Sequence, residues 1–235
     1  MNWRERSQPF LNPLCVALDV DSKARALQLV SELKDIAGGF KIGPRLALRY
    51  GQEFIQEVSQ QSPVFVDCKF FDIPSTMKAA VRASFEAGAS LVTVHALAGA
   101  EALQELAVLE KELSELRPFR ILAVTILTSW SQASLPPVMK ILPISNHVQE
   151  LAKLVVTSGL SGIVCSPEEL DLLQTIHAYK VTPGIRFSTD EKGDQKRVLG
   201  PSEALQKGSS LLVVGRPIVE AKNPREAANK YLAAF

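Results

Sequence analysis

The sequence predicts a single (β/α)8 barrel, in which eight parallel strands, each followed by a helix, close into a ring. Short apolar segments rich in valine, isoleucine and leucine alternate with segments that have the apolar spacing of amphipathic helices. This alternation occurs eight times in 235 residues, and such barrels commonly use about 250 residues in one domain. No linker or low-complexity tract divides the chain, so we expect one domain over residues 1–235.

The predicted strands barely alternate between apolar and polar residues, which is typical of strands buried on both faces under helices. We expect them at residues 14–20, 38–43, 63–69, 90–95, 120–127, 162–166, 179–185 and 211–215.

The predicted helices repeat apolar residues every three or four positions, and several begin at Ser, Asp or Pro. An open doubly wound sheet is the alternative arrangement, but its first turn is normally rich in glycine, whereas the first strand here runs into Asp19-Val20-Asp21. We expect the helices at residues 22–33, 44–58, 74–88, 99–113, 147–159, 167–176, 201–208 and 224–235.

The composition indicates a globular protein without a nucleic-acid or membrane partner. It is 46% hydrophobic, and its net charge of +1 gives no basic excess for nucleic acid. No apolar run reaches the roughly 18 residues of a membrane span, and the N-terminal segment lacks the apolar stretch of a signal peptide. Three cysteines give no disulfide framework, so we expect a reduced, cytoplasmic protein.

Charged residues at the carboxyl end of the third strand are the first candidates for chemistry, because barrel active sites lie at these strand ends. Asp67 and Lys69 are two residues apart, so both face the same side of the strand. Charges there are costly to desolvate unless they are paired. In isolation, a structural ion pair, with Asp72 capping the helix that begins near Pro74, explains these residues equally well.

Two further charges follow apolar runs in the first and second strands. Asp19 ends the first strand, and Lys41 lies in the second, although an exposed strand end would also accommodate a lysine. A single network in which each charge keeps its neighbours ionised would join Lys41, Asp67, Lys69 and Asp72.

The ends of the last two strands predict an anion site. Gly184 and Arg186 follow the seventh strand, and Gly215 and Arg216 follow the eighth, where barrels often bind phosphate. The guanidinium offers a planar fork of donors, although either arginine alone could cap a helix. The long polar segment at about 187–200 is expected to be a lid on the phosphate side, with a solvated loop as the alternative.

The remaining polar residues predict neither a metal site nor a nucleophilic triad. No metal-ligand spacing occurs, and no Ser-His-Asp arrangement is visible. We interpret His95, at the end of the fourth strand, as a hydrogen-bonded wall residue. We therefore expect no metal and no cofactor.

The constellation resembles the orotidine 5′-phosphate decarboxylase family over nearly the whole chain. The most specific motif is Asp67-x-Lys69-x-x-Asp72-Ile73-Pro74. The supporting motifs occur in the family's order: Ala17-Leu18-Asp19, Phe40-Lys41-Ile42-Gly43, Leu127-Thr128-Ser129, Thr182-Pro183-Gly184-Ile185-Arg186, Asp194-Gln195-Lys196-Arg197 and Val214-Gly215-Arg216-Pro217.

The resemblance implies conversion of orotidine 5′-phosphate to UMP in pyrimidine biosynthesis, without metal or cofactor. It implies that Lys69 donates the proton to C6 and that Asp67 lies beside the leaving carboxylate. Lys41 and Asp72 would complete the network, with Asp72 supplied by the second subunit of a homodimer.

The resemblance also implies a set of binding residues. Asp19 and Lys41 would hold the ribose, with Thr76 reaching in from the partner subunit. Thr128 would contact the base, although the adjacent Ser129 is the alternative. The phosphate side would comprise Arg186, Gln195, Gly215 and Arg216.

Two rival functions remain open from the sequence. The first is a Mg²⁺-dependent sugar-phosphate decarboxylase or synthase of the same superfamily, which typically has a carboxylate where this chain has Lys41. An ammonium there would repel a divalent cation. The second is a binding-only barrel, which would need no proton donor, whereas Lys69 and its flanking aspartates are present.

Overall fold

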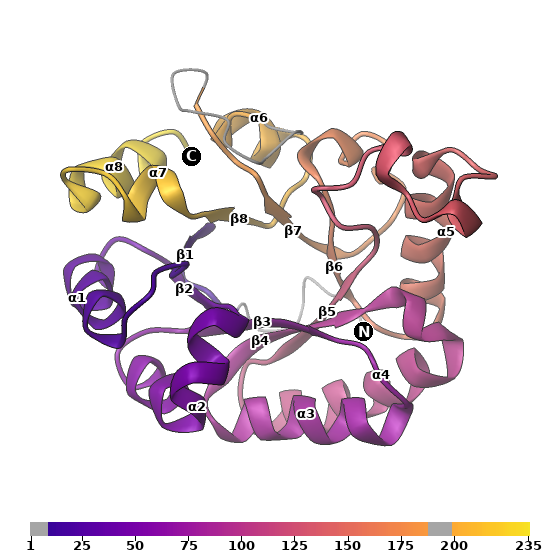
Figure 1. The fold of residues 1–235 in the computed structure, drawn as a ribbon, viewed down its shortest axis with the longest axis horizontal. Helices are drawn as coiled ribbons and strands as arrows, with labels where there is room; N and C mark the ends of the chain where they lie inside the picture. Colours follow the sequence, from indigo (N-terminus) through magenta and orange to yellow (C-terminus); the bar gives the residue numbers. More distant parts are fainter. Residues whose placement is uncertain (1–8, 188–198) are drawn as a thin grey trace.

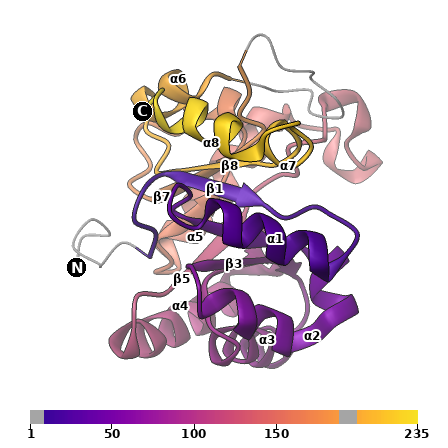
Figure 2. The ribbon, with the colours of Figure 1, turned by 90° about the vertical axis from the view of Figure 1, so that its left-hand side faces the viewer.

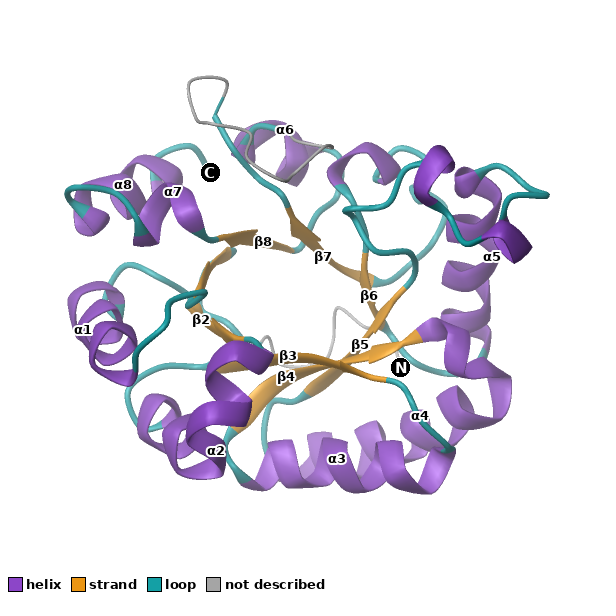
Figure 3. Cartoon of the chain, viewed as in Figure 1, coloured by secondary structure: helices purple, strands orange, loops and turns teal. Residues whose placement is uncertain are grey.

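The computed structural model, which describes residues 9–187 and 199–235, confirms the (β/α)8 barrel. Eight parallel strands follow one another in sequence order around a closed ring, and β8 pairs with β1. Figure 1 shows this ring and the helices outside it, and Figure 3 separates the two layers by colour. The strands are β1 (Leu14–Ala17), β2 (Gly39–Ile42), β3 (Val64–Phe70), β4 (Ala89–His95), β5 (Arg120–Val124), β6 (Gly162–Val164), β7 (Tyr179–Pro183) and β8 (Leu211–Val214).

The near-continuous apolar strands bury both of their faces. In β1, Cys15 and Ala17 belong to the cluster that fills the barrel interior. The intervening Leu14 and Val16 belong to the larger cluster between strands and helices. Because side chains alternate along a strand, one short apolar run serves both layers.

The helices form the outer layer, and Figure 2 shows α1 running alongside β1. Helix α8 packs against α1 and α7, so the last helix meets the first. None of the described helices is long and apolar enough to cross a membrane. The helices are α1 (Lys23–Leu33), α2 (Pro44–Ser59), α3 (Pro74–Glu86), α4 (Gly99–Leu116), α5 (Ile144–Thr157), α6 (Pro201–Gln206), α7 (Arg216–Val219) and α8 (Pro224–Leu232).

The helix predicted at residues 167–176 is wrong. The structure has a 3-10 helix at Pro167–Glu169, followed by turns. The Glu169 carboxylate accepts a hydrogen bond from the Ser166 amide, and several later backbone bonds span only three residues. Leu170 and Leu173 are nevertheless fully buried. The apolar spacing therefore reflects burial of a tight turn, which sequence periodicity does not separate from an α-helix.

The pairing of β3 with β4 is irregular where β3 carries its charged residues. Val66 pairs with Val92, and Phe70 pairs with Val94, so four steps along β3 match two along β4. The extra residues make a bulge, a feature that redirects side chains beside active sites. The bulge contains Asp67 and Lys69, which places both at the end of the barrel where the strands terminate.

Candidate active site

A cavity of about 550 Å³ opens at the carboxyl ends of the strands. This volume is within the range of small-molecule sites. Its walls come from the ends of β1, β2, β3, β5, β6, β7 and β8, together with the loops that follow them. Side chains from the barrel interior, such as Phe65 and Val181, form part of the lining. The cavity is therefore where sequence reasoning predicts the chemistry to occur.

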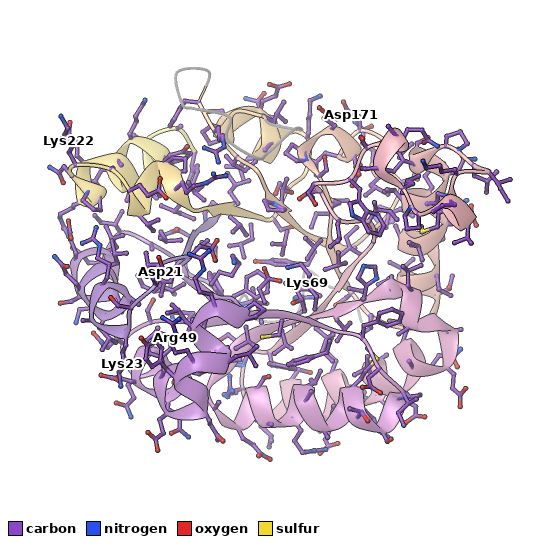
Figure 4. All side chains as sticks on the ribbon, in the orientation of Figure 1. Asp21, Lys23, Arg49, Lys69, Asp171 and Lys222 are labelled. Atoms are coloured by element: carbon purple, nitrogen blue, oxygen red, sulfur yellow. The ribbon has the colours of Figure 1, made fainter. Side chains whose placement is uncertain are left out.

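Three strands bring four of the predicted charges together. Asp67 Oδ1 lies 2.8 Å from Lys69 Nζ, and Asp67 Oδ2 lies 3.4 Å from Lys41 Nζ. Lys41 Nζ also donates a hydrogen bond to Asp19 Oδ1 at 3.2 Å. The carboxylate of Asp67 thus lies between two ammonium groups, each on a different one of its oxygens. Figure 4 shows Lys69 within the ring of strands.

Burial and charge act in opposite directions on these groups. The Asp67 side chain is only 14% exposed, and this burial opposes its ionisation. Lys41 and Lys69 outweigh burial, so the pKa of Asp67 is lowered from its ordinary value. Burial likewise opposes the charge of Lys41, but Asp67 and Asp19 raise the pKa of Lys41. The described pocket therefore holds an ionised Asp67 and a charged Lys41 at neutral pH.

The backbone of Lys69 has an unusual conformation. Its φ is 49°, and it is the only non-glycine residue with positive φ in residues 9–187 and 199–235. Such a left-handed conformation costs an ordinary residue roughly 1–2 kcal/mol. Strain of this kind is typical of functional sites. This backbone conformation occurs within the bulge in β3, and the ammonium of Lys69 contacts the carboxylate of Asp67.

The cavity is basic at the end formed by β7 and β8. Arg186 is buried, and both Arg186 and Arg216 line the cavity, as do Gly184 and Gly215. Gly184 has a φ of 80°, which a side chain would disfavour, so a glycine is required to turn the chain from β7 toward Arg186. Thr128 and Ser129 both line the cavity after β5. The geometry does not favour one of these two hydroxyls over the other.

Asp72 and Thr76 do not join this cluster. Both residues are exposed, and neither is among the described residues that line the cavity. The Asp72 carboxylate accepts a hydrogen bond from the Ile73 amide at 2.7 Å, next to the start of α3. A single chain therefore brings together three residues of the predicted network, Lys41, Asp67 and Lys69. Asp19 joins them, and Asp72 does not.

Two sequence predictions fall outside the described residues. Gln195 lies in the part of the chain that the structure does not describe. The segment predicted as a lid at about 187–200 also lies outside the described residues, apart from Phe187, Leu199 and Gly200. At its base the Arg186 amide donates a hydrogen bond to the Leu199 carbonyl at 3.0 Å.

Sequence reasoning missed further residues of the site, with Arg45 and Thr93 among them. Arg45, in the first turn of α2, lines the cavity, and its guanidinium bonds Asp21 at 2.9 Å. Arg49 donates to the Asp21 carbonyl at 2.7 Å, and Figure 4 shows Asp21 and Arg49 on the same side of the molecule. Thr93, on β4, bonds both Asp67 and Lys69. A single threonine within an apolar strand gives no sequence pattern that would single it out.

His95 is hydrogen-bonded, as expected, but it is not a wall residue of the cavity. It is 9% exposed and is absent from the described lining of the cavity. Its Nδ1 accepts a hydrogen bond from the Leu97 amide at 3.3 Å, and its ring lies 5.7 Å from that of Phe71. Burial and the charge of Lys69 lower the pKa of His95, which favours the neutral imidazole.

Relatives of known sequence match this chain over nearly its whole length. An orotidine 5′-phosphate decarboxylase of Paramagnetospirillum magneticum is 40% identical over 231 residues, which cover 95% of this chain and 98% of the relative. One of Carboxydothermus hydrogenoformans is 42% identical, with 93% of this chain and 94% of the relative covered.

Solved structures give the same result. The crystal structure of orotidine 5′-phosphate decarboxylase from Lactobacillus acidophilus superposes with a TM-score of 0.82 at 32% identity, covering 95% of this chain and 99% of that one. An uncharacterized conserved protein from Geobacillus kaustophilus superposes with a TM-score of 0.79 at 27% identity, covering 94% and 99%. The profile of the orotidine 5′-phosphate decarboxylase / HUMPS family matches residues 12–231. The chain belongs to this family.

Proposed function

We propose that this protein decarboxylates orotidine 5′-phosphate to UMP, with Lys69 as the proton donor and without a metal or organic cofactor. The observation that carries the proposal is the position of Asp67 between the ammonium groups of Lys41 and Lys69, inside a cavity that also holds Arg186 and Arg216. The family and the relatives support the same activity.

The chemistry of decarboxylation accounts for the paired charges. Loss of CO₂ leaves an electron pair at C6 of the pyrimidine, where no carbonyl is placed to delocalise it as an enolate. A fixed ammonium at C6 stabilises this charge and then supplies the proton that completes the product. In this assignment Lys69 is that ammonium. Asp67 holds it in place and lies beside the substrate carboxylate, whose departure relieves the repulsion between two neighbouring anions.

The charge of the cavity fits a phosphorylated nucleotide. Among the described lining residues, five are basic and three are acidic, although the chain as a whole is nearly neutral. We assign the phosphate to Arg186, Arg216 and Gly215, and the ribose to Asp19 and Lys41. Thr128 or Ser129 would contact the base from the segment after β5. Binding energy from the phosphate, far from C6, is then available for positioning the reacting groups.

The position of Lys41 opposes the Mg²⁺-dependent alternative. A divalent cation in this pocket would use the carboxylate of Asp67, since oxygen ligands suit Mg²⁺. Lys41 Nζ is already 3.4 Å from that carboxylate and is held by Asp19 on its other side. A cation next to Asp67 would therefore have to displace one charged lysine and approach another.

We also propose a homodimer in which Asp72 and Thr76 serve the partner's site. Both residues are exposed and follow β3 in the chain, and neither lines the cavity. Asp72 lies between Phe71 and Ile73, whose side chains are 61% and 64% exposed. Adjacent exposed apolar residues of this size are typical of contact surfaces. A two-fold axis would let one such surface complete both sites.

We place the protein in the cytoplasm. All three cysteines are free, and Cys15 and Cys165 are buried, which suits a reducing compartment.

The predicted lid at about 187–200 stays a prediction.

The proposed function is tested with the purified protein and three ligands. Orotidine 5′-phosphate should be consumed, with UMP formed in equal amount as followed by chromatography. The unphosphorylated nucleoside orotidine should react far more slowly, since it lacks the group assigned to Arg216. A ketose 6-phosphate supplied with Mg²⁺ should remain unchanged. Binding of orotidine 5′-phosphate without UMP formation, or turnover of the sugar phosphate alone, would overturn the proposal.

A further inference from the structure

The hydroxyl of Thr93 connects the Asp67 carboxylate with the backbone amide of Lys69 on β3. Thr93 lies on the neighbouring strand β4 and is fully buried. Its Oγ1 donates a hydrogen bond to Asp67 Oδ1 at 2.9 Å and accepts one from the Lys69 amide at 2.9 Å. We propose that Thr93 is a positioning residue, which fixes the Asp67 carboxylate and the backbone of Lys69 in one geometry.

The irregular pairing of the strands explains why a side chain is needed here. Thr93 lies between Val92 and Val94, whose partners on β3 are Val66 and Phe70. Regular backbone pairing is therefore interrupted opposite Thr93. The Lys69 amide is directed at the Thr93 hydroxyl, and without that acceptor a partly buried amide would lose its bond. The hydroxyl thus replaces a backbone acceptor that the bulge removes.

The same hydrogen bond supports the unfavourable backbone of Lys69. A φ of 49° at a lysine persists only where surrounding contacts impose it. Lys69 has two such contacts on the site side: its amide bonds Thr93, and its ammonium bonds Asp67. Because Thr93 also bonds Asp67, the three residues form a closed loop of hydrogen bonds. Displacing one member therefore displaces the other two.

The electrostatic surroundings of Asp67 make this role measurable. Asp67 faces Lys41 from β2 and Lys69 from its own strand, with the thiols of Cys15 on β1 and Cys68 nearby. Burial raises the pKa of both thiols, so they remain neutral. The Thr93 hydroxyl is one of the groups that lower the pKa of Asp67. Removing it takes away this contribution and raises the pKa of Asp67.

The test compares three substitutions of Thr93 with a matched control. Thr93→Val keeps the shape and removes both hydrogen bonds, and Thr93→Ala removes them without any risk of overpacking. Thr93→Ser keeps the hydroxyl. The control is Thr125→Val, because Thr125 is equally buried but its hydroxyl bonds only the Val164 carbonyl, outside the charge network. The inference rests on the proposed function for its kinetic readout.

With orotidine 5′-phosphate as substrate, kcat should fall about 100-fold in Thr93→Val and Thr93→Ala, because small displacements of reacting groups cost about that much. KM should change little, since Thr93 does not line the cavity. The acid limb of kcat/KM should move to higher pH. Thr93→Ser should restore kcat to within about tenfold of the wild type, and Thr125→Val should leave kcat and the acid limb unchanged. Wild-type kcat with an unmoved acid limb in both Thr93→Val and Thr93→Ala would overturn the inference.

A second readout separates this inference from the proposed function. Hydrogen exchange of the Lys69 amide, measured by NMR without substrate, should accelerate at least about tenfold in Thr93→Val and Thr93→Ala, since a lost bond is worth that order. It should not accelerate in Thr125→Val or Thr93→Ser. If the wild type fails to decarboxylate the substrate but exchange accelerates as stated, the proposed function is wrong and the positioning role stands. Unchanged exchange in both hydroxyl-deleted variants would remove the positioning role even if the wild type is active.

Discussion

Lys69 Nζ lies 2.8 Å from Asp67 Oδ1, and the two residues are separated by one position on a bulged strand. The fold of β3 itself therefore brings the pair together. Charges that are fixed before the reaction need no reorganisation when charge develops at the substrate. This arrangement requires two energetically unfavourable features, a left-handed backbone at Lys69 and an ionised Asp67 carboxylate in a largely buried position.

Replacement of Lys69 by alanine should abolish decarboxylation while the barrel remains folded. The ammonium is the sole candidate for the proton donor at C6 in our assignment. Turnover of orotidine 5′-phosphate and far-UV circular dichroism measure the two effects. Lys78→Ala is the matched control, since Lys78 on α3 forms only a surface ion pair with Glu105. Activity of Lys69→Ala close to that of the wild type would refute the assignment.

The backbone of Lys69 predicts that Lys69→Gly is more stable than Lys69→Ala. Both substitutions remove the ion pair with Asp67, but only glycine adopts a φ of 49° without steric cost. The difference in free energy of unfolding should be about 1 kcal/mol in favour of glycine, after allowance for its greater entropy when unfolded. Urea unfolding of the two proteins measures it. An equal or greater stability of the alanine variant would show that Lys69 is not strained.

Arg216→Ala should weaken recognition of the phosphate. Arg216 lines the cavity just after β8. A hydrogen bond to a charged group contributes roughly 1.5–3 kcal/mol, so kcat/KM should fall about 10- to 100-fold. The affinity for UMP should fall similarly, whereas that for uridine should not change. Arg82→Ala, which removes a surface ion pair with Glu112, serves as the control. Equal losses for UMP and uridine would place Arg216 away from the phosphate.

The pKa of Asp67 predicts a pH dependence of stability. Because its pKa is lowered in the folded state, the charged carboxylate stabilises the protein above its ordinary pKa of about 4. This stabilisation is lost as the pH falls through the lowered pKa. Asp67→Asn should therefore be destabilised relative to the wild type by a constant amount from about pH 5 to 8, with the gap narrowing only below about pH 4. Thermal unfolding across this range measures the gap. A gap that already closes near pH 6 would mean that burial, rather than the lysines, dominates at Asp67.

The proposed dimer predicts complementation between inactive subunits. Asp72→Ala and Lys69→Ala proteins should each be nearly inactive. After verified subunit exchange, about half of the dimers contain one chain of each kind, and each such dimer has one intact site out of two. About a quarter of wild-type activity should return. If none returns, Asp72 serves its own chain or plays no part in the reaction.

The strands and the main charged residues of the cavity could be predicted from the sequence. Runs such as those around Val16 and Val92 are apolar on both faces, and this pattern depends only on burial between two layers. Asp67 and Lys69 could be placed on one side because they are two residues apart. The apolar spacing of 167–176 predicts an α-helix wrongly, because a buried tight turn and an amphipathic helix place Leu170 and Leu173 inside at similar spacing.

The finer geometry of the site could not be predicted, because it depends on contacts between strands. The left-handed backbone of Lys69 follows from a bulge in the pairing of β3 with β4, which no local pattern reveals. Thr93 becomes significant only when that bulge places it opposite Asp67 and Lys69. Arg45 reaches the cavity from α2, a helix whose apolar spacing predicts its buried face but not its contact with a ligand site.

The dependence of activity on metal tests the central claim most directly. Protein treated with EDTA and then passed into metal-free buffer should convert orotidine 5′-phosphate to UMP at its full rate, and a titration with Mg²⁺ should leave that rate unchanged. This result is expected because the charge beside Asp67 is supplied by Lys41 and Lys69. Activity that disappears with EDTA and returns with Mg²⁺ would contradict the account.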